Sequence, residues 1–441
     1  MTKVTVIDTI MGAGKTSYII NFMNKTGVQE TFDAPERRFI YVTPLLSEVE
    51  RVQTACPDLR FKDPKPIHGR KFYGLQRLIE DGQNIATTHE LFRMLTPEVC
   101  KLINDANYTL VIDEVLTCCD HFKELTAHDQ RDLFGSGKLY VENDGSGRLR
   151  WNHKDHGNYV GKFSSVKHLC DNGNLAVYAD RRGKRGVLLW QFPTEFLGCF
   201  DEVFVLTYLY HGSAMSSYLE AKGVPVSLMA VSGDREQGYS LTRWDEHSEA
   251  LKKAEIRNLI TIYEGPGNRI GTPNGREQPL SSSWFKRQSS KTLAKLRGST
   301  VTFFKNHAKT CAGENAWTTF KDHRAKLKGA GYAGKSCWIS LNTKSTNDYA
   351  HKRSMAYLAN IFCLPVLRNY FAANGVVMND DAFAISEMVQ VIWRTAIRNG
   401  EPIMLYIPSE RMRNLFKLWL ECDSTAELMQ RLQPETKVLA A

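Results

Sequence analysis

The chain has 441 residues, of which 42% are hydrophobic and 24% charged, and its formal net charge is +9 at pH 7. These ordinary values exclude a low-complexity chain and predict a globular protein of two or three domains. No apolar run approaches the roughly 20 residues of a membrane-spanning helix, so we expect no membrane partner. Ten cysteines without a Cys-x-x-Cys pair, and a start that lacks a signal-peptide pattern, predict reduced thiols in a cytoplasmic protein.

The most informative stretch is Thr9–Thr16, which reads Thr-Ile-Met-Gly-Ala-Gly-Lys-Thr. A predicted strand, Val4–Ile7, precedes it, and a predicted helix follows from Ser17. Strand, Gly-rich loop, Gly-Lys-Thr and helix is the context of a phosphate-binding loop, although the full pattern has Gly where this chain has Thr9. The alternative is a Gly-rich turn without a ligand.

In a phosphate-binding loop, Gly12 and Gly14 allow successive backbone N–H groups to face phosphate oxygens, and the helix N-terminus adds partial positive charge. Lys15 is expected to reach the β- and γ-phosphates, and the Thr16 hydroxyl to bind Mg²⁺. The predicted cofactors are therefore ATP and Mg²⁺. The predicted nucleotide-binding residues in this stretch are Met11, Gly12, Ala13, Gly14, Lys15, Thr16 and Ser17.

Strand and helix signals then alternate, which is typical of a parallel sheet with helices on both faces. The strand predicted at Tyr108–Ile112 ends on two acids, Asp113 and Glu114, at the edge where such sheets bind ligands. We expect Asp113 to bind the nucleotide's Mg²⁺ and Glu114 to activate the attacking water, an effect of about 10²–10⁴-fold. The alternative is a pair of helix-capping acids after a core strand.

The pattern changes between about Gly135 and Pro193, where two hairpin signatures predict a β-rich insertion (about 135–193). The sheet pattern resumes at Glu202–Tyr208. We predict a first domain at residues 1–225, which contains the insertion, and a second at residues 226–441.

Positive charge is concentrated in the stretch 284–353, which holds fifteen Lys or Arg and only three acids. Aromatic residues are interleaved with these charges. Cations that follow phosphates and rings that stack on bases are the ingredients of a nucleic-acid-binding groove. The alternative is a solvated basic face over core aromatics.

The late segment Gln390–Arg398 is predicted to lie on a helix spanning 388–398. Lys15-Thr16, Asp113-Glu114 and this segment, in that order, resemble a superfamily 2 helicase of the DEAD/DEAH-like ATPases, in particular its phage-type and origin-binding-type members. The resemblance implies an α/β fold of two RecA-like P-loop lobes with parallel sheets.

The resemblance also implies that Gln390, Arg394 and Arg398 reach the γ-phosphate and act in catalysis with Lys15 and Glu114. Trp393 replaces the family's glycine, and Arg398 falls one residue late. On one helix the three side chains would share a face.

Other stretches resemble the family's nucleic-acid contacts. Small hydroxyls at strand ends and helix N-termini suit phosphate groups, but they equally suit plain helix caps. The nucleic-acid-binding residues implied by the resemblance are Thr43, Pro44, Thr87, Thr88, His89, Thr346 and Asn347.

The sequence thus predicts an ATP-dependent DNA helicase or translocase of phage replication or recombination, located in the host cytoplasm. Its expected partner is single-stranded or forked DNA, with RNA left open, and replication proteins are conceivable partners. The alternatives are an origin-binding or loading ATPase without processive unwinding and a terminase-type packaging ATPase. A small-molecule kinase fits the chain length less well.

Overall fold

The computed structural model describes residues 3–27, 37–179, 186–342 and 347–433. By its packing the chain divides into two compact units. The first comprises the residues up to Ile7, Lys15–Met229 and Leu364–Met378; the second comprises Asp8–Gly14, Ala230–Cys363 and the residues from Asn379 on. In the described ranges, no helix is long and apolar enough to cross a bilayer.

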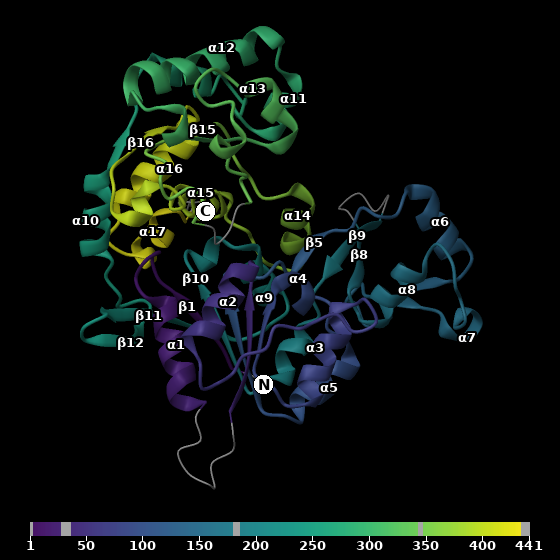
Figure 1. Cartoon of the computed structure of the whole chain (residues 1–441). Helices are drawn as coiled ribbons and strands as arrows, with labels where there is room; N and C mark the ends of the chain where they lie inside the picture. Colours follow the sequence, from purple (N-terminus) through teal and green to yellow (C-terminus); the bar gives the residue numbers. More distant parts are fainter. Residues whose placement is uncertain (1–2, 28–36, 180–185, 343–346, 434–441) are drawn as a thin grey trace, which may run out of the picture. The chain divides into compact units, whose positions relative to one another are not determined.

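The largest sheet has the strand order β12-β11-β1-β10-β4-β2-β3. Figure 1 labels four of these strands, β1, β10, β11 and β12. β2 runs parallel to β3 and β4, β10 parallel to β4, and β1 parallel to β11. β1, β2, β4 and β10 consist almost wholly of buried residues, which is why they read as continuous apolar runs. The strands are β1 (Lys3–Asp8), β2 (Arg38–Thr43), β3 (Ile85–Thr88), β4 (Tyr108–Asp113), β10 (Glu202–Thr207), β11 (Val226–Asp234) and β12 (Gly238–Arg243).

Helices follow most of these strands, as the alternating sequence pattern predicts. α5 (Pro97–Asn104), for example, begins with Pro97 at its first position, and its cap residue Thr96 accepts a hydrogen bond from the Val99 N–H. Its apolar stripe then buries Val99, Cys100 and Ile103. The other α-helices described in the first unit outside its middle segment are α1 (Lys15–Thr26), α2 (Leu46–Ala55), α3 (Lys71–Glu80), α4 (His89–Phe92), α9 (Ala214–Ala221) and α14 (Pro365–Ala373).

A middle segment between β4 and β10 forms a subdomain with its own core, which includes Leu133, Leu149 and Leu188. Both predicted hairpins are present as antiparallel pairs, β6 with β7 and β8 with β9, although the turn 180–185 lies outside the described residues. The described part of this segment also contains helices, so it is more mixed than predicted. Its elements are β5 (Cys119–His121), α6 (Ala127–Gly135), β6 (Leu139–Val141), β7 (Leu149–Trp151), α7 (His153–His156), α8 (Ser164–Asp171), β8 (Leu175–Ala179) and β9 (Gly186–Gln191).

The second unit is built on a four-stranded sheet with the order β13-β16-β15-β14, in which every pair runs parallel. The predicted α/β class with parallel sheets is thereby confirmed. The strands are β13 (Ile260–Ile262), β14 (Asn315–Thr318), β15 (Ser354–Tyr357) and β16 (Ile403–Tyr406). The helices described are α10 (Ala250–Leu259), α11 (Ser282–Arg287), α12 (Ser290–Thr302), α13 (Arg324–Leu327), α15 (Asp380–Ile392), α16 (Glu410–Glu421) and α17 (Thr425–Arg431).

Candidate functional site

The Gly-rich loop joins β1 to α1 and has the backbone that its glycines allow. Gly12 has φ 78° and Gly14 has φ 93°, conformations that other L-residues rarely adopt. A Cβ at Gly14 would lie only 2.1 Å from Cε1 of Tyr239 on β12, and a Cβ at Gly12 would lie 3.0 Å from Cζ2 of Trp393. Backbone conformation therefore favours glycine at both positions, and at Gly14 the ring of Tyr239 leaves no room for a Cβ unless the ring shifts.

The first half of the loop is hydrogen-bonded to residues on and after β11. The indole Nε1 of Trp244 donates to Asp8 Oδ2 at 3.2 Å, and the Val231 N–H donates to the Thr9 hydroxyl at 2.9 Å. The Ile10 N–H donates to the Glu249 carboxylate at 2.8 Å. Thr9 is fully buried and does not have a positive φ. The departure from the glycine of the pattern thus has a structural explanation, because the Thr9 side chain makes a bond that glycine cannot make.

Asp113 and Glu114 lie at the carboxyl end of β4, as predicted. β10 separates β4 from β1, so the ends of β1 and β4 are about 10 Å apart, two strand spacings. Lys15, the first residue of α1, is close enough to lower the pKa of Asp113 by charge attraction. The structure therefore brings the predicted lysine and the predicted acid into one electrostatic site within the first unit.

Burial and two neighbouring carboxylates, Glu114 and then Glu48, raise the pKa of Asp113 to about 7, and Lys15 and Arg51 only partly oppose them. Glu48 lies on α2, is itself buried, and accepts a hydrogen bond from Arg51 at 2.9 Å. Glu48 is buried and Asp113 and Glu114 are half-buried, so water only partly screens the mutual repulsion of these three acids. Sequence reasoning missed Glu48, because nothing in its local pattern distinguishes it from a surface glutamate.

The backbone at the acidic pair is strained. Glu114 has φ 66°, which costs of the order of 1–3 kcal/mol for a non-glycine residue, and its N–H donates to the Leu206 carbonyl at 2.9 Å. The ring Nε2 of His89 lies 2.9 Å from the Asp113 carbonyl oxygen, an acceptor only, so this nitrogen is the donor. Strain of this kind persists only where the surroundings hold it, which is common at functional sites.

Some of the residues predicted to contact nucleic acid are buried and others are exposed. Thr43 and Thr87 are buried, and in the described part of the chain their hydroxyls have no hydrogen-bond partner. Thr43 pairs with Thr88 across β2 and β3, so these threonines line the same sheet edge as Asp113, and Thr88, unlike Thr43 and Thr87, is half-exposed there. Pro44 is partly exposed and Asn347 exposed, while Thr346 lies outside the described residues.

The expectation of one helix carrying Gln390, Arg394 and Arg398 on a shared face is wrong. α15 ends at Ile392, and the Thr395 N–H and hydroxyl both bond back to the Ile392 carbonyl. Arg398 lies on the following 3₁₀ turn, Ala396–Asn399. Gln390 and Arg394 are buried, and the segment approaches the Gly-rich loop through Trp393, the residue that replaces the family's glycine.

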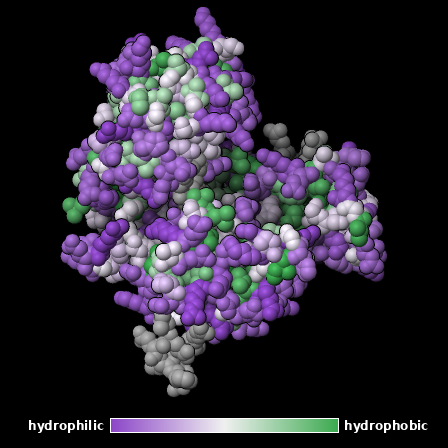
Figure 2. Space-filling view, in the orientation of Figure 1, coloured by the Kyte–Doolittle hydropathy of each residue, from purple (hydrophilic) through white to green (hydrophobic). Residues whose placement is uncertain are grey.

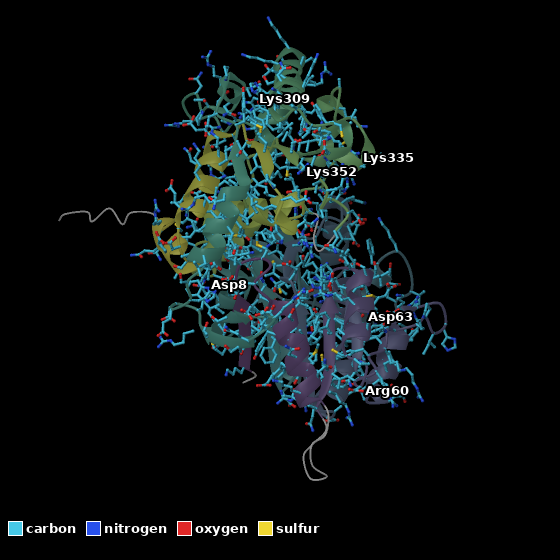
Figure 3. The ribbon with its side chains drawn as sticks, turned by 60° about the vertical axis from the view of Figure 1, so that its left-hand side comes forward. Asp8, Arg60, Asp63, Lys309, Lys335 and Lys352 are labelled. Carbon is cyan, nitrogen blue, oxygen red and sulfur yellow. The ribbon has the colours of Figure 1, made fainter. Side chains whose placement is uncertain are left out.

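The basic stretch 284–353 has its rings inside and its charges outside. Trp284, Phe285 and Trp317 belong to the buried core of the second unit, so they offer no platform for stacking bases. Hydrophilic residues cover much of the surface of this region (Figure 2), and Figure 3 labels Lys309 and Lys335 there. The alternative of a basic face over core aromatics is the one observed. The exposed cations are Lys286, Arg287, Lys291, Lys295, Arg297, Lys305, Lys309, Lys321, Lys326, Lys328, Lys335 and Arg353.

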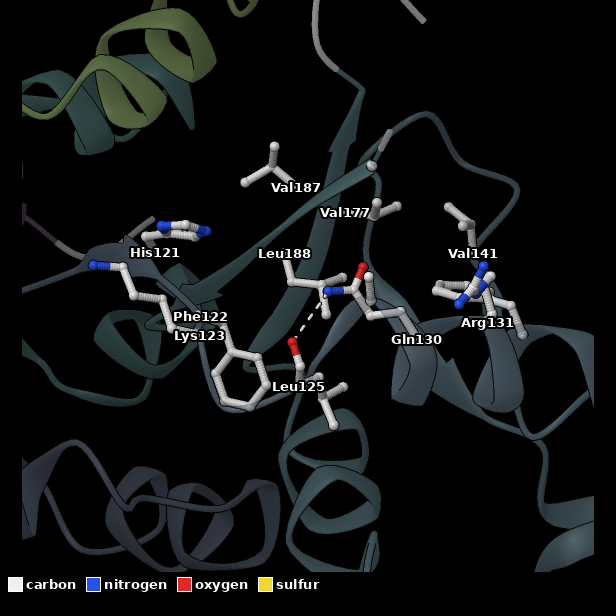
Figure 4. Close-up of a pocket in the computed structure, with 13 residues that line it drawn as sticks. His121, Phe122, Lys123, Leu125, Gln130, Arg131, Val141, Val177, Val187 and Leu188 are labelled. Carbon is white, nitrogen blue, oxygen red and sulfur yellow. Dashed lines mark hydrogen bonds between the residues drawn. The ribbon is translucent and has the colours of Figure 1, made fainter. Parts of the chain in front are cut away.

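A separate cavity of about 1110 Å³ lies in the middle segment, between α6 and the β8–β9 strands (Figure 4). Its lining includes Phe122, Lys123 and Arg131 and none of the predicted site residues. No group of three or more His, Cys, Asp or Glu with metal-holding geometry occurs within the described ranges.

The fold and the loop together define an α/β protein with parallel sheets and a strand–loop–helix of the phosphate-loop type. Residues 254–420 match the YonV C-terminal Rossmann-like domain, and residues 120–190 match the YonV middle domain. The chain is 38% identical over 433 residues to the SPbeta prophage-derived uncharacterized protein YonV of Bacillus subtilis (strain 168), covering 96% of this chain and 99% of that protein. The chain therefore belongs to the YonV family.

Three solved structures share a distant likeness with the chain. They are titled XPD_Helicase (TM-score 0.44, 9% identity, 94% of this chain and 95% of that chain), XPD_APO (0.47, 10%, 94% and 95%) and Structure of S. tokodaii Xpd4 (0.46, 10%, 94% and 93%). At these scores the likeness carries no argument about activity.

Proposed function

We propose that this protein is a nucleic-acid-dependent ATPase that translocates along or unwinds DNA, acting in phage replication or recombination. The observation that carries the proposal is the electrostatic site of Lys15, Asp113 and Glu114; in the chain, Lys15 directly follows a loop whose two glycines have positive φ. The prophage origin of the relative named above supports the phage setting.

The residues fit Mg-ATP. The loop Gly12–Thr16 runs into the N-terminus of α1, where backbone N–H groups and Lys15 would hold the phosphates. Thr16 and Asp113 would hold Mg²⁺, and this ion would offset the repulsion between Asp113 and its neighbours Glu114 and Glu48. Glu114, held in its strained conformation, would orient and deprotonate the attacking water.

The second unit would supply the coupling to nucleic acid. Trp393 lies against Gly12, and through this contact the segment Gln390–Arg394 would respond to a nucleotide bound at the loop. The exposed cations of 284–353 would follow the phosphate backbone of the strand, a mode of binding that weakens steeply with salt.

The first test is ATP hydrolysis with and without single-stranded DNA. Lys15→Ala should abolish DNA-stimulated hydrolysis, whereas Lys25→Ala, an exposed lysine in the last turn of the same helix, should not. Persistent activity in Lys15→Ala would refute the assignment of the site.

A strand-displacement assay with 3′- and 5′-tailed duplexes, in DNA and in RNA, tests the finer proposal. Displacement that requires hydrolysis supports a helicase. ATP-dependent, sequence-specific duplex binding without displacement would instead support an origin-binding or loading ATPase.

A further inference from the structure

Three consecutive residues at the start of the loop form hydrogen bonds with residues 222 to 239 positions later in the chain. The pairs are Asp8 with Trp244, Thr9 with Val231 and Ile10 with Glu249. The next turn depends on them, because the Ala13 N–H donates to the Ile10 carbonyl at 3.3 Å. The hydrogen bond that fixes Ile10 therefore also fixes the turn Ile10–Ala13, which contains Gly12.

Glu249 is the charged member of this group, and only 3% of it is exposed. One carboxylate oxygen accepts from Ile10 at 2.8 Å, and the other accepts from the Thr425 hydroxyl at 3.3 Å. Its own N–H donates to the Asp423 carbonyl at 2.8 Å. A carboxylate buried this deeply is costly unless both oxygens are bonded, and here the bonds join the loop to the start of α17.

A buried lysine completes the cluster. Lys253, one turn after Glu249 on α10, has no exposed surface and donates to the Trp419 carbonyl near the end of α16 at 2.6 Å. Its charge lies close enough to Glu249 for the two to interact. The Glu249 carboxylate thus links the loop to the first residue of α17, and the Glu249 N–H links Glu249 to Asp423, just before α17.

We propose that Glu249 is a positioning residue of the nucleotide site and that, together with the Thr9 hydroxyl, it sets the backbone of Thr9–Ile10 so that the following N–H groups face phosphate. Where the usual pattern relies on a glycine at position 9, this chain relies on two hydrogen bonds, one with Val231 and one with Glu249. The inference rests on the proposed function, because it assigns part of the same site.

The test compares matched variants of the full-length protein for Mg-ATP affinity and thermal stability. Thr9→Val removes the hydroxyl at nearly constant volume, whereas Thr9→Ser keeps it. Glu249→Ala removes the acceptor, whereas Glu249→Gln keeps an acceptor oxygen for the Ile10 N–H. We expect Thr9→Val and Glu249→Ala to raise the Kd at least about tenfold, and Thr9→Ser and Glu249→Gln to stay within about threefold of the wild type.

A role in folding alone would lower the melting temperature of Thr9→Val and Glu249→Ala and leave the Kd unchanged, which would overturn the inference. If Glu249→Ala does not fold, the Thr9 pair decides by the same criterion. If the wild type binds Mg-ATP and Lys15→Ala does not, an unchanged Kd in Thr9→Val refutes this inference only. If the wild type and Lys15→Ala bind Mg-ATP with the same Kd, the proposed function fails, and the inference fails with it.

Discussion

The ring of His89 donates a hydrogen bond from Nε2 to the backbone carbonyl of Asp113 at 2.9 Å, and so joins the first residue of α4 to the last residue of β4. The sequence alone suggested that His89 contacts nucleic acid. Its position also makes it a support for the acidic pair, since the Asp113 carbonyl directly precedes the strained Glu114.

His89→Ala should therefore lower ATP hydrolysis about tenfold and destabilise the protein by about 1 kcal/mol, because a partly buried carbonyl loses its donor. His89→Gln places an amide N–H near the position of Nε2 and should retain most of the activity. Single-turnover hydrolysis and thermal unfolding of the two variants would check this. Equal losses in both variants would contradict the support role.

Asp113→Asn should abolish Mg²⁺-dependent hydrolysis yet raise the melting temperature. The pKa of Asp113 is about 7 in the folded protein and about 4 in an unfolded chain, so ionisation of this group costs stability as the pH rises from 4 to 7. The stabilisation by Asp113→Asn should accordingly be larger at pH 8 than at pH 5. Thermal unfolding at pH 5 and at pH 8 measures this stabilisation. A variant less stable than the wild type at pH 8 would contradict the electrostatic account.

Gly14→Ala should destabilise the loop twice over, through its φ of 93° and through the ring of Tyr239. We expect a loss of about 1–3 kcal/mol together with loss of nucleotide binding. Adding Tyr239→Ala should relieve the steric part and leave the backbone part. If the double variant is as stable as the wild type, the φ of Gly14 does not matter for stability. If it is no more stable than Gly14→Ala, the Tyr239 ring causes no steric clash.

His323→Phe should stabilise the protein in acid. His323 is buried, stacks on Phe285 with ring centroids 4.9 Å apart, and neither ring nitrogen has a hydrogen-bond partner among the residues described. Burial lowers the pKa of His323, so below about pH 6.5 the unfolded chain takes up a proton that the folded protein does not. The advantage of His323→Phe should grow between pH 7.5 and pH 5.5, as measured by chemical denaturation. A pH-independent difference would contradict this.

Charge reversal of Lys291 and Lys295, both exposed on α12, tests the basic face. If each lysine neutralises one phosphate, the double variant should bind single-stranded DNA more weakly, and the slope of log K against log salt should fall by about 0.7 for each phosphate that is no longer neutralised. Reversal of Lys252, a half-exposed lysine of α10 outside 284–353 that pairs with Glu255 at 2.8 Å, is the control for a charge change elsewhere on the second unit. An unchanged salt slope would exclude these lysines from the binding face.

Sequence reasoning performed best where local pattern and chemistry coincide. The strands Val4–Ile7 and Tyr108–Ile112 are apolar runs because parallel strands are buried on both faces, and Gly12-x-Gly14 indicates a backbone that only glycine adopts easily. The sequence prediction failed at Gln390–Arg398. The polar residues there keep helical spacing, but the hydrogen bonds of the same segment end the helix at Ile392. The bonds that end it are made by Thr395 and, through the Ala396 N–H, by the carbonyl of Lys352.

The sequence by itself determined the α/β class, the Gly-Lys-Thr loop and the acids at the end of β4, since each depends on neighbours within a few residues. Only the tertiary structure decided that Glu48 joins Asp113, that Trp284 and Phe285 are core, and that Thr9 and Ile10 are held by Val231 and Glu249. The physical reason is that burial and hydrogen-bond partners depend on residues far apart in the chain, and a one-dimensional pattern contains no record of which distant groups meet.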